Sequence, residues 1–200
     1  MARTRPLLIL LMLAPAGLSA QLAINPQAGV TFQNLTDEPE GADFKASVGW
    51  MLGADFRIGD RLYLQPGAFF ERNVTAISGG DTAVIEDDLV RTDLKLKALV
   101  GFNLIDGDAF RLRLNTGPTY DILLSVDNTG DEIEWDKGDF NSGSLNWNAG
   151  LGVDLSFITV ETGMAYGLSD VVKEEVAFTS ESRYFTWYLT AGIVLGGGND

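Results

Sequence analysis

The sequence predicts an all-β protein, an eight-stranded antiparallel up-and-down β-barrel, and three observations lead to this prediction. Apolar and polar residues alternate with a period of two through eight segments. The connections between these segments are alternately long and short, as in a barrel of consecutive hairpins with both termini at one end. The polar face of the segments is rich in Gly, which suits the crowded interior of a narrow barrel.

The alternation is clearest in four segments, of which 44–57 is the best example. Its even positions, from Phe44 to Phe56, are all apolar, whereas its odd positions are mostly small or charged. Such a pattern indicates a strand that faces two different environments. The eight predicted strands cover residues 27–35, 44–57, 62–74, 90–104, 110–126, 145–157, 158–169 and 183–195.

The long and short connections differ in charge as well as in length. The short reversals lie at 58–61, at 105–108 and near 157–158. The long connections are 36–43, 75–88, 127–144 and 170–182, and they hold 18 of the 28 acidic residues. The sequence therefore predicts an acidic end of the barrel opposite the end that carries the short turns.

Alternation alone does not decide whether the apolar face meets lipid or the core of a soluble, exported lipocalin-like binding barrel, and this alternative stays open. Lipid is favoured by the Gly-rich polar face and by strands long enough to cross a bilayer at a tilt. It is also favoured by four aromatic residues on the apolar face beside short turns, where a membrane barrel carries an aromatic girdle: Phe56, Phe102, Phe110 and Phe157. We predict a transmembrane barrel.

Residues 1–20 have the order of a secretory signal peptide: a basic start, a short apolar run and then small residues. We expect cleavage after Ala20, with Ala16 as the alternative, and residues 21–200 as the barrel domain of an exported protein. The chain has no His and no Cys, which excludes most Ser–His triads, thiolate nucleophiles and common zinc sites. A net charge of −14 argues against nucleic-acid binding. We predict a protein that is not an enzyme and has no catalytic residue, cofactor or metal site.

Charged residues on the polar face would lie in the lumen. Because an unpaired buried charge is destabilising by several kcal/mol, we expect cations and carboxylates there to form a structural ion-pair network. The predicted members are Glu71, Arg91, Asp93, Lys95, Lys97, Arg111, Arg113, Asp121, Asp154 and Glu161. Lys45, Arg57 and Asp55 also fall on this face.

Four strand motifs resemble those of the PorT-like outer-membrane β-barrel family. They are AGVTFQNL at 28–35, LYLQPGAFF at 62–70, GPTY at 117–120 and AYGL at 165–168. The resemblance implies a small barrel of the OmpA/OmpX type in the outer membrane. Its partners would be outer-membrane lipids and, during assembly, the insertion machinery and periplasmic chaperones. Pro66 and Pro118 each remove a ladder donor, so we expect them at bulges or strand ends.

Three functions follow as hypotheses. The first is a sealed surface barrel whose acidic loops support envelope integrity or surface contacts, with weak binding of divalent cations at these loops. The second is a narrow porin or small-solute transport barrel. The third is the soluble lipocalin-like barrel described above.

Overall fold

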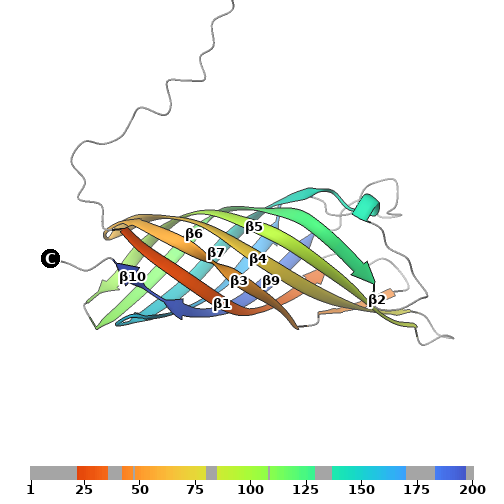
Figure 1. Ribbon diagram of the computed structural model, residues 1–200, viewed down its shortest axis with the longest axis horizontal. Coiled ribbons are helices and arrows are strands. Elements are labelled where there is room, and N and C mark those ends of the chain that lie inside the picture. Colours follow the sequence, from red (N-terminus) through yellow and green to blue (C-terminus); the bar gives the residue numbers. More distant parts are fainter. Residues whose placement is uncertain are drawn as a thin grey trace, which may run out of the picture.

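The computed structural model describes residues 22–35, 42–46, 48–79, 85–107, 109–128, 137–169 and 183–196. Eight long antiparallel strands follow one another around a closed barrel, and the last of them pairs with the first (Figure 1). This confirms the predicted eight-stranded antiparallel barrel. The eight strands are β1 (Leu22–Leu35), β3 (Val48–Gly59), β4 (Leu62–Gly79), β5 (Ile85–Asp106), β6 (Phe110–Asn128), β7 (Gly143–Leu155), β8 (Ile158–Gly167) and β9 (Tyr184–Ile193).

Three short elements extend the ends of the barrel. β10 (Leu195–Gly196) pairs with the start of β1 at one end, whereas β2 (Ala42–Ala46) and the 3-10 turn η1 (Lys137–Asp139) lie at the other end (Figure 1). We call the end with the short turns the turn side and the opposite end the loop side. In the part of the chain that the structure describes, no helix is long and apolar enough to cross a membrane.

The strand predicted over 44–57 is divided in two. Trp50 of β3 pairs with Arg72 of β4, and Ala46 of β2 pairs with Thr75. Three residues therefore lie between the pairs on one strand and two on the other, so the register changes by one residue near position 47. An alternating sequence cannot show such a shift, because the hydrogen-bonded partner determines it.

The expectation for the two prolines was wrong. Pro66 pairs with Ala98 within β4, and Pro118 pairs with Trp147 within β6, so both lie inside strands. The register shifts between β5 and β6 occur elsewhere, at Thr92/Asp93 and at Asn103/Ile105. Each proline is paired with the strand on one side, whereas pairing with the strand on the other side is interrupted at the proline without a change of register.

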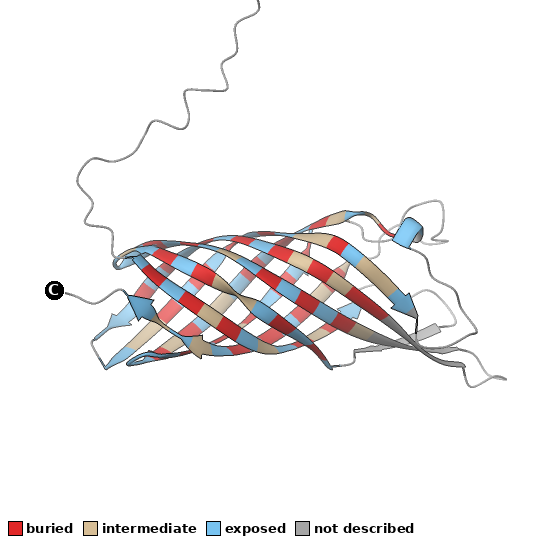
Figure 2. Ribbon diagram, in the orientation of Figure 1, coloured by how far each residue is buried: buried red, intermediate tan, exposed pale blue. Residues whose placement is uncertain are grey.

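Burial alternates along the long strands (Figure 2), and most of the buried residues are polar. In β8, for example, Thr159 and Glu161 are buried whereas Ile158 and Val160 are exposed. The barrel is thus polar inside and apolar outside, which is the reverse of a water-soluble fold. The predicted signal peptide lies outside the described residues, as do residues 36–41, 80–84, 129–136 and 170–182 of the long connections.

Candidate functional site

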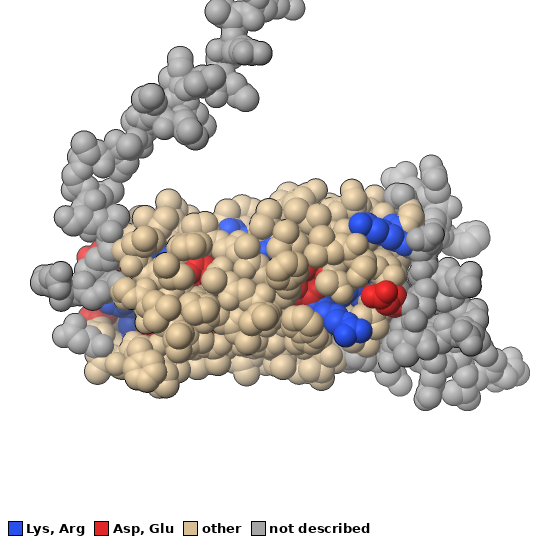
Figure 3. All heavy atoms as spheres, viewed as in Figure 1, with Lys and Arg blue, Asp and Glu red and all other residues tan. Residues whose placement is uncertain are grey.

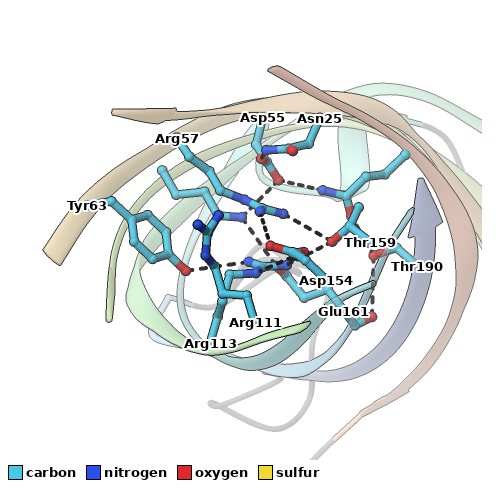
Figure 4. Close-up of polar contacts among 12 residues, drawn as sticks. Asn25, Asp55, Arg57, Tyr63, Arg111, Arg113, Asp154, Thr159, Glu161 and Thr190 are labelled. Carbon is cyan, nitrogen blue, oxygen red and sulfur yellow. Dashed lines mark hydrogen bonds and ion pairs between the residues drawn. The ribbon is translucent and has the colours of Figure 1, made fainter. Parts of the chain in front are cut away.

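Arg113 lies at the centre of a polar cluster in the turn-side half of the lumen (Figure 4). Its side chain comes from β6 and is fully buried. One guanidinium nitrogen, Nη2, lies 3.1 Å from Asp154 Oδ1 and donates to Thr159 Oγ1 at 2.9 Å. The other, Nη1, lies 3.3 Å from Glu161 Oε2 and 3.4 Å from the Tyr63 hydroxyl oxygen. Arg113 therefore links β6 to β4 across the bore as well as to β7 and β8.

Arg57 of β3 approaches the same carboxylate from another wall. Its Nη1 lies 2.7 Å from Asp154 Oδ2, and its Nη2 donates to Thr159 at 3.1 Å. Asp154 and Thr159 are thus shared by Arg57 and Arg113. A carboxylate held by two guanidiniums has each oxygen satisfied by a charge-assisted hydrogen bond, so burial of these charges is compensated.

Within the described residues, the side-chain donors to Asp55 are amides and it forms no ion pair. Its Oδ1 accepts from Asn25 at 2.6 Å, and its Oδ2 accepts from Gln27 at 2.7 Å and Gln65 at 2.8 Å. Gln65 also donates to Glu161 at 3.3 Å, which joins this group to the cluster around Arg113. The result is one connected network of hydrogen bonds and ion pairs that joins side chains of six strands: β1, β3, β4, β6, β7 and β8.

Lys97 lies near the middle of the bore without a carboxylate partner. Among the described residues, no carboxylate oxygen lies within the 4.0 Å of an ion pair from its Nζ. The ammonium instead lies 4.3 Å from the Phe69 ring centre and 4.7 Å from that of Tyr188, both cation–π contacts. With Met51, these two rings form a small apolar core inside a polar lumen. The expectation that a carboxylate would bridge Lys97 was wrong.

A second group of charges lies in the loop-side half of the lumen. Lys95 forms an ion pair with Glu71, and its Nζ lies 3.7 Å from Asp121 Oδ2. Arg91 Nη2 lies 3.0 Å from Asp93 Oδ1. The Arg91 guanidinium also lies 4.7 Å from the Tyr184 ring centre and 5.7 Å from that of Phe140. Charged and aromatic groups therefore cross the bore at this level too.

The inward glycines give the large lumen side chains room to lie flat against the wall. A Cβ at Gly101 would overlap the Tyr63 ring, and one at Gly152 would overlap the Arg113 guanidinium. Tyr188 has the same relation to Gly163. The glycines thus permit large side chains to fill the space beside the neighbouring strand, which closes the narrow bore.

The structure places nine of the ten predicted network residues in the two clusters or between them. The exception is Arg111, which lies at the turn-side rim with a partly exposed side chain. Its Nε lies 2.5 Å from Asp106 Oδ1, a carboxylate that sequence reasoning did not include. The register shift between Asn103 and Ile105 sets Arg111 opposite Asp106. The side chain of Lys45 lies outside the described residues.

Several residues of the network were missed by sequence reasoning. Tyr63, Gln65 and Tyr188 lie on strands whose alternation is weak, and Asn25 precedes the predicted start of its strand. The signal was present in part, because odd positions from 25 to 33 alternate in polarity with their neighbours. Neutral hydrogen-bonding side chains are simply less conspicuous in a sequence than charges.

The outer surface of the barrel exposes large apolar side chains of all eight long strands. On the face drawn in Figure 3 the larger charged areas lie toward the ends, and only small ones are visible between them. The four predicted girdle residues at the turn side, Phe56, Phe102, Phe110 and Phe157, are all exposed. Toward the loop side the exposed aromatic residues include Trp50, Trp147, Tyr166 and Trp187. A soluble protein rarely exposes a contiguous apolar patch of this extent. A closed barrel with this exterior and a polar, ion-paired interior is an integral membrane β-barrel.

Residues 14–173 match the family described as "Outer membrane protein beta-barrel domain", and the chain belongs to this family. The protein is located in the outer membrane, so the soluble lipocalin-like alternative is wrong. No curated protein matches the sequence.

Solved outer-membrane proteins share the fold at low sequence identity. OprG of Pseudomonas aeruginosa is 15% identical with a TM-score of 0.53, and the match covers 88% of this chain and 95% of OprG. Neisserial surface protein A (NspA) is 10% identical with a TM-score of 0.52, covering 86% and 96%. Ail of Yersinia pestis is 12% identical with a TM-score of 0.47, covering 86% and 98%. OprG and NspA support the barrel fold of this chain.

Proposed function

We propose that this protein is a closed, non-enzymatic outer-membrane barrel whose loop-side face makes surface contacts that support envelope integrity. The observation that supports the closed state is the position of Arg113. Its guanidinium is fully buried in the bore and is bound by side chains of β4, β7 and β8.

The shape of the lumen supports this proposal. An eight-stranded barrel is just wide enough for its interior to be filled by side chains. Here the fully or almost fully buried inward residues include large ones: Tyr63, Phe69, Leu99, Arg113 and Tyr188. Because glycines on neighbouring strands receive several of these groups, the bore is filled at several levels rather than at one constriction.

The charges in the lumen support it as well. In the turn-side cluster an ion pair between buried groups crosses the bore, because Arg57 of β3 binds Asp154 of β7. In the loop-side group the ion pairs join neighbouring strands, and the Arg91 guanidinium reaches across to the Tyr184 ring. Removing one partner of such a pair leaves a buried charge without compensation, which costs about 3–5 kcal/mol. Opening a path for hydrated ions would require several such pairs to separate together.

The long connections support the part of the proposal that concerns surface contacts. Segments 36–43, 75–88, 127–144 and 170–182 hold 18 acidic residues and only two basic ones, Lys137 and Lys173. We propose that these segments face the outside of the cell and bind divalent cations weakly. Bridging by such cations would let an acidic surface associate with other anionic surface groups. Membership of the PorT-like branch also stays a proposal, based on the four strand motifs.

Conductance in planar bilayers tests the closed state. The purified mature protein, with folding checked by heat-modifiable gel mobility, should give no steps above the bare bilayer. A triple variant with Arg113, Glu161 and Tyr63 replaced by Ala should raise the ion permeability if it inserts, which shows that a path through the bore can be detected. Steady, large single-channel steps from the wild type would contradict the proposal and favour a narrow porin.

A further inference from the structure

A small cavity lies at the turn-side mouth of the lumen, beside the cluster around Arg113. Its volume is about 20 Å³, sufficient for one water molecule, and it is partly open to the outside of the barrel end. Three arginines from two strands line it, which distinguishes it from the rest of the ion-paired bore. The lining residues are Ala23, Arg57, Gly59, Asp60, Tyr63, Asn103, Arg111 and Arg113.

Positive groups outnumber negative ones in this lining, with three guanidiniums and one carboxylate. Three carboxylates outside the lining pair with these arginines. Asp154 binds Arg57 and Arg113, Glu161 binds Arg113, and Asp106 forms a pair with Arg111 at the rim. The excess of positive charge is therefore confined to the side chains that line the cavity, and any further anion must bind through donors that these pairs leave free.

Hydrogen-bond donors remain available at this wall. Within the described part of the chain, Nε of Arg57 has no acceptor, although the residue is only 6% exposed. The Tyr63 hydroxyl accepts from Arg113, so its own proton is free to be donated. Arg111 uses Nε for Asp106, and its partly exposed side chain has two further nitrogens. Figure 4 shows Arg57, Tyr63 and Arg111 around one side of the bore.

We propose that this cavity is a binding site for a small oxyanion, with inorganic phosphate as its simplest form. Guanidinium groups bind phosphate and carboxylate oxygens through paired, charge-assisted hydrogen bonds. The enclosed volume admits one oxygen of the anion, and the open mouth holds the rest beside Arg111. The site is independent of whether the bore conducts, because it is reached from the turn side without passing the Arg113 cluster.

Titration calorimetry of the folded mature protein in phosphate-free detergent at low salt tests this site. Inorganic phosphate should bind saturably, and Arg111→Gln should weaken its affinity by about tenfold or more, as expected for the loss of a charged hydrogen bond. Tyr63→Phe should weaken it by a smaller factor. Arg61→Gln is the matched control, because Arg61 lies at the same end but contacts the outward Phe102 ring and does not line the cavity.

The outcomes distinguish a specific phosphate site from nonspecific attraction of phosphate by positive residues. Arg111 is at the rim and its variant should fold, which heat-modifiable mobility verifies. Absence of saturable phosphate binding by the folded wild type would overturn the proposal, as would an equal loss in Arg111→Gln and Arg61→Gln. A water-soluble short-chain phosphatidylglycerol identifies the source of the phosphate group. If it displaces phosphate from the wild type, the occupant is a lipid headgroup. If it does not, the occupant is a free anion, and either result supports the site.

Discussion

Replacing Arg113 by Ala should destabilise the barrel more than any replacement of an exposed arginine. The side chain is fully buried and bonds to Tyr63, Thr159, Asp154 and Glu161. Truncation removes all of these bonds at once and leaves a void in the bore.

The size of this loss of stability depends on which partners Asp154 and Glu161 keep after Arg113 is truncated. Asp154 keeps Arg57 at 2.7 Å, so one cation still compensates it. Among the described residues, Glu161 keeps hydrogen bonds from neutral donors, Gln65 at 3.3 Å and the Tyr188 hydroxyl at 3.2 Å, and no other ion pair. One carboxylate thus loses its ion-pair partner and the other does not. We therefore expect the free energy of unfolding to fall by about 3 kcal/mol, the lower end of the ~3–5 kcal/mol that is typical of a broken buried ion pair.

Urea unfolding of the protein in lipid vesicles, followed by Trp fluorescence and heat-modifiable mobility, measures this loss. Arg61→Ala at the same end of the barrel is the control and should leave the midpoint unchanged. The double variant Arg113→Ala/Glu161→Gln should recover part of the stability, because it removes the uncompensated charge. If Arg113→Ala unfolds at the wild-type midpoint, the lumen is hydrated and the reasoning from dry ion pairs is refuted.

Three further predictions concern the outer face, the inward glycines and the topology. Leu96 is 40% exposed, and Leu96→Arg should lower the free energy of unfolding by about 2–4 kcal/mol in the same assay if Leu96 contacts lipid at the middle of the bilayer. A variant as stable as the wild type would show that Leu96 does not lie there. Gly101→Leu should prevent normal folding because its side chain overlaps the Tyr63 ring, and Tyr63→Ala in the same chain should restore part of the heat-modifiable band; no rescue would contradict this packing. Protease treatment of intact cells should cut within 36–43, 75–88, 127–144 and 170–182, whereas efficient cleavage at Arg61 would reverse the topology.

The sequence determined the strands and the side of each strand that faces outward. Alternation with a period of two depends on neighbours along the chain, and so segments such as 110–126 could be recognised without any knowledge of pairing. The same parity placed Arg91, Lys95 and Arg113 on the inner face, where the structure has them. The odd or even position of a residue predicts which face of the strand its side chain lies on, but not which residue it contacts.

The partners were decided by the tertiary structure alone. Which carboxylate reaches Arg113 depends on the stagger between strands and on the bore's width, because β4 and β8 contact it from walls that are distant in the sequence. A one-residue register shift sets Arg111 against Asp106 at the rim. Lys97 lies opposite Gly67 of β4 and Thr119 of β6, and its ammonium contacts the Phe69 and Tyr188 rings instead of a carboxylate. Alternation is a local property of the chain, whereas register is fixed only when the hydrogen-bond ladders close the barrel, so the sequence gives the faces and closure selects the contacts between them.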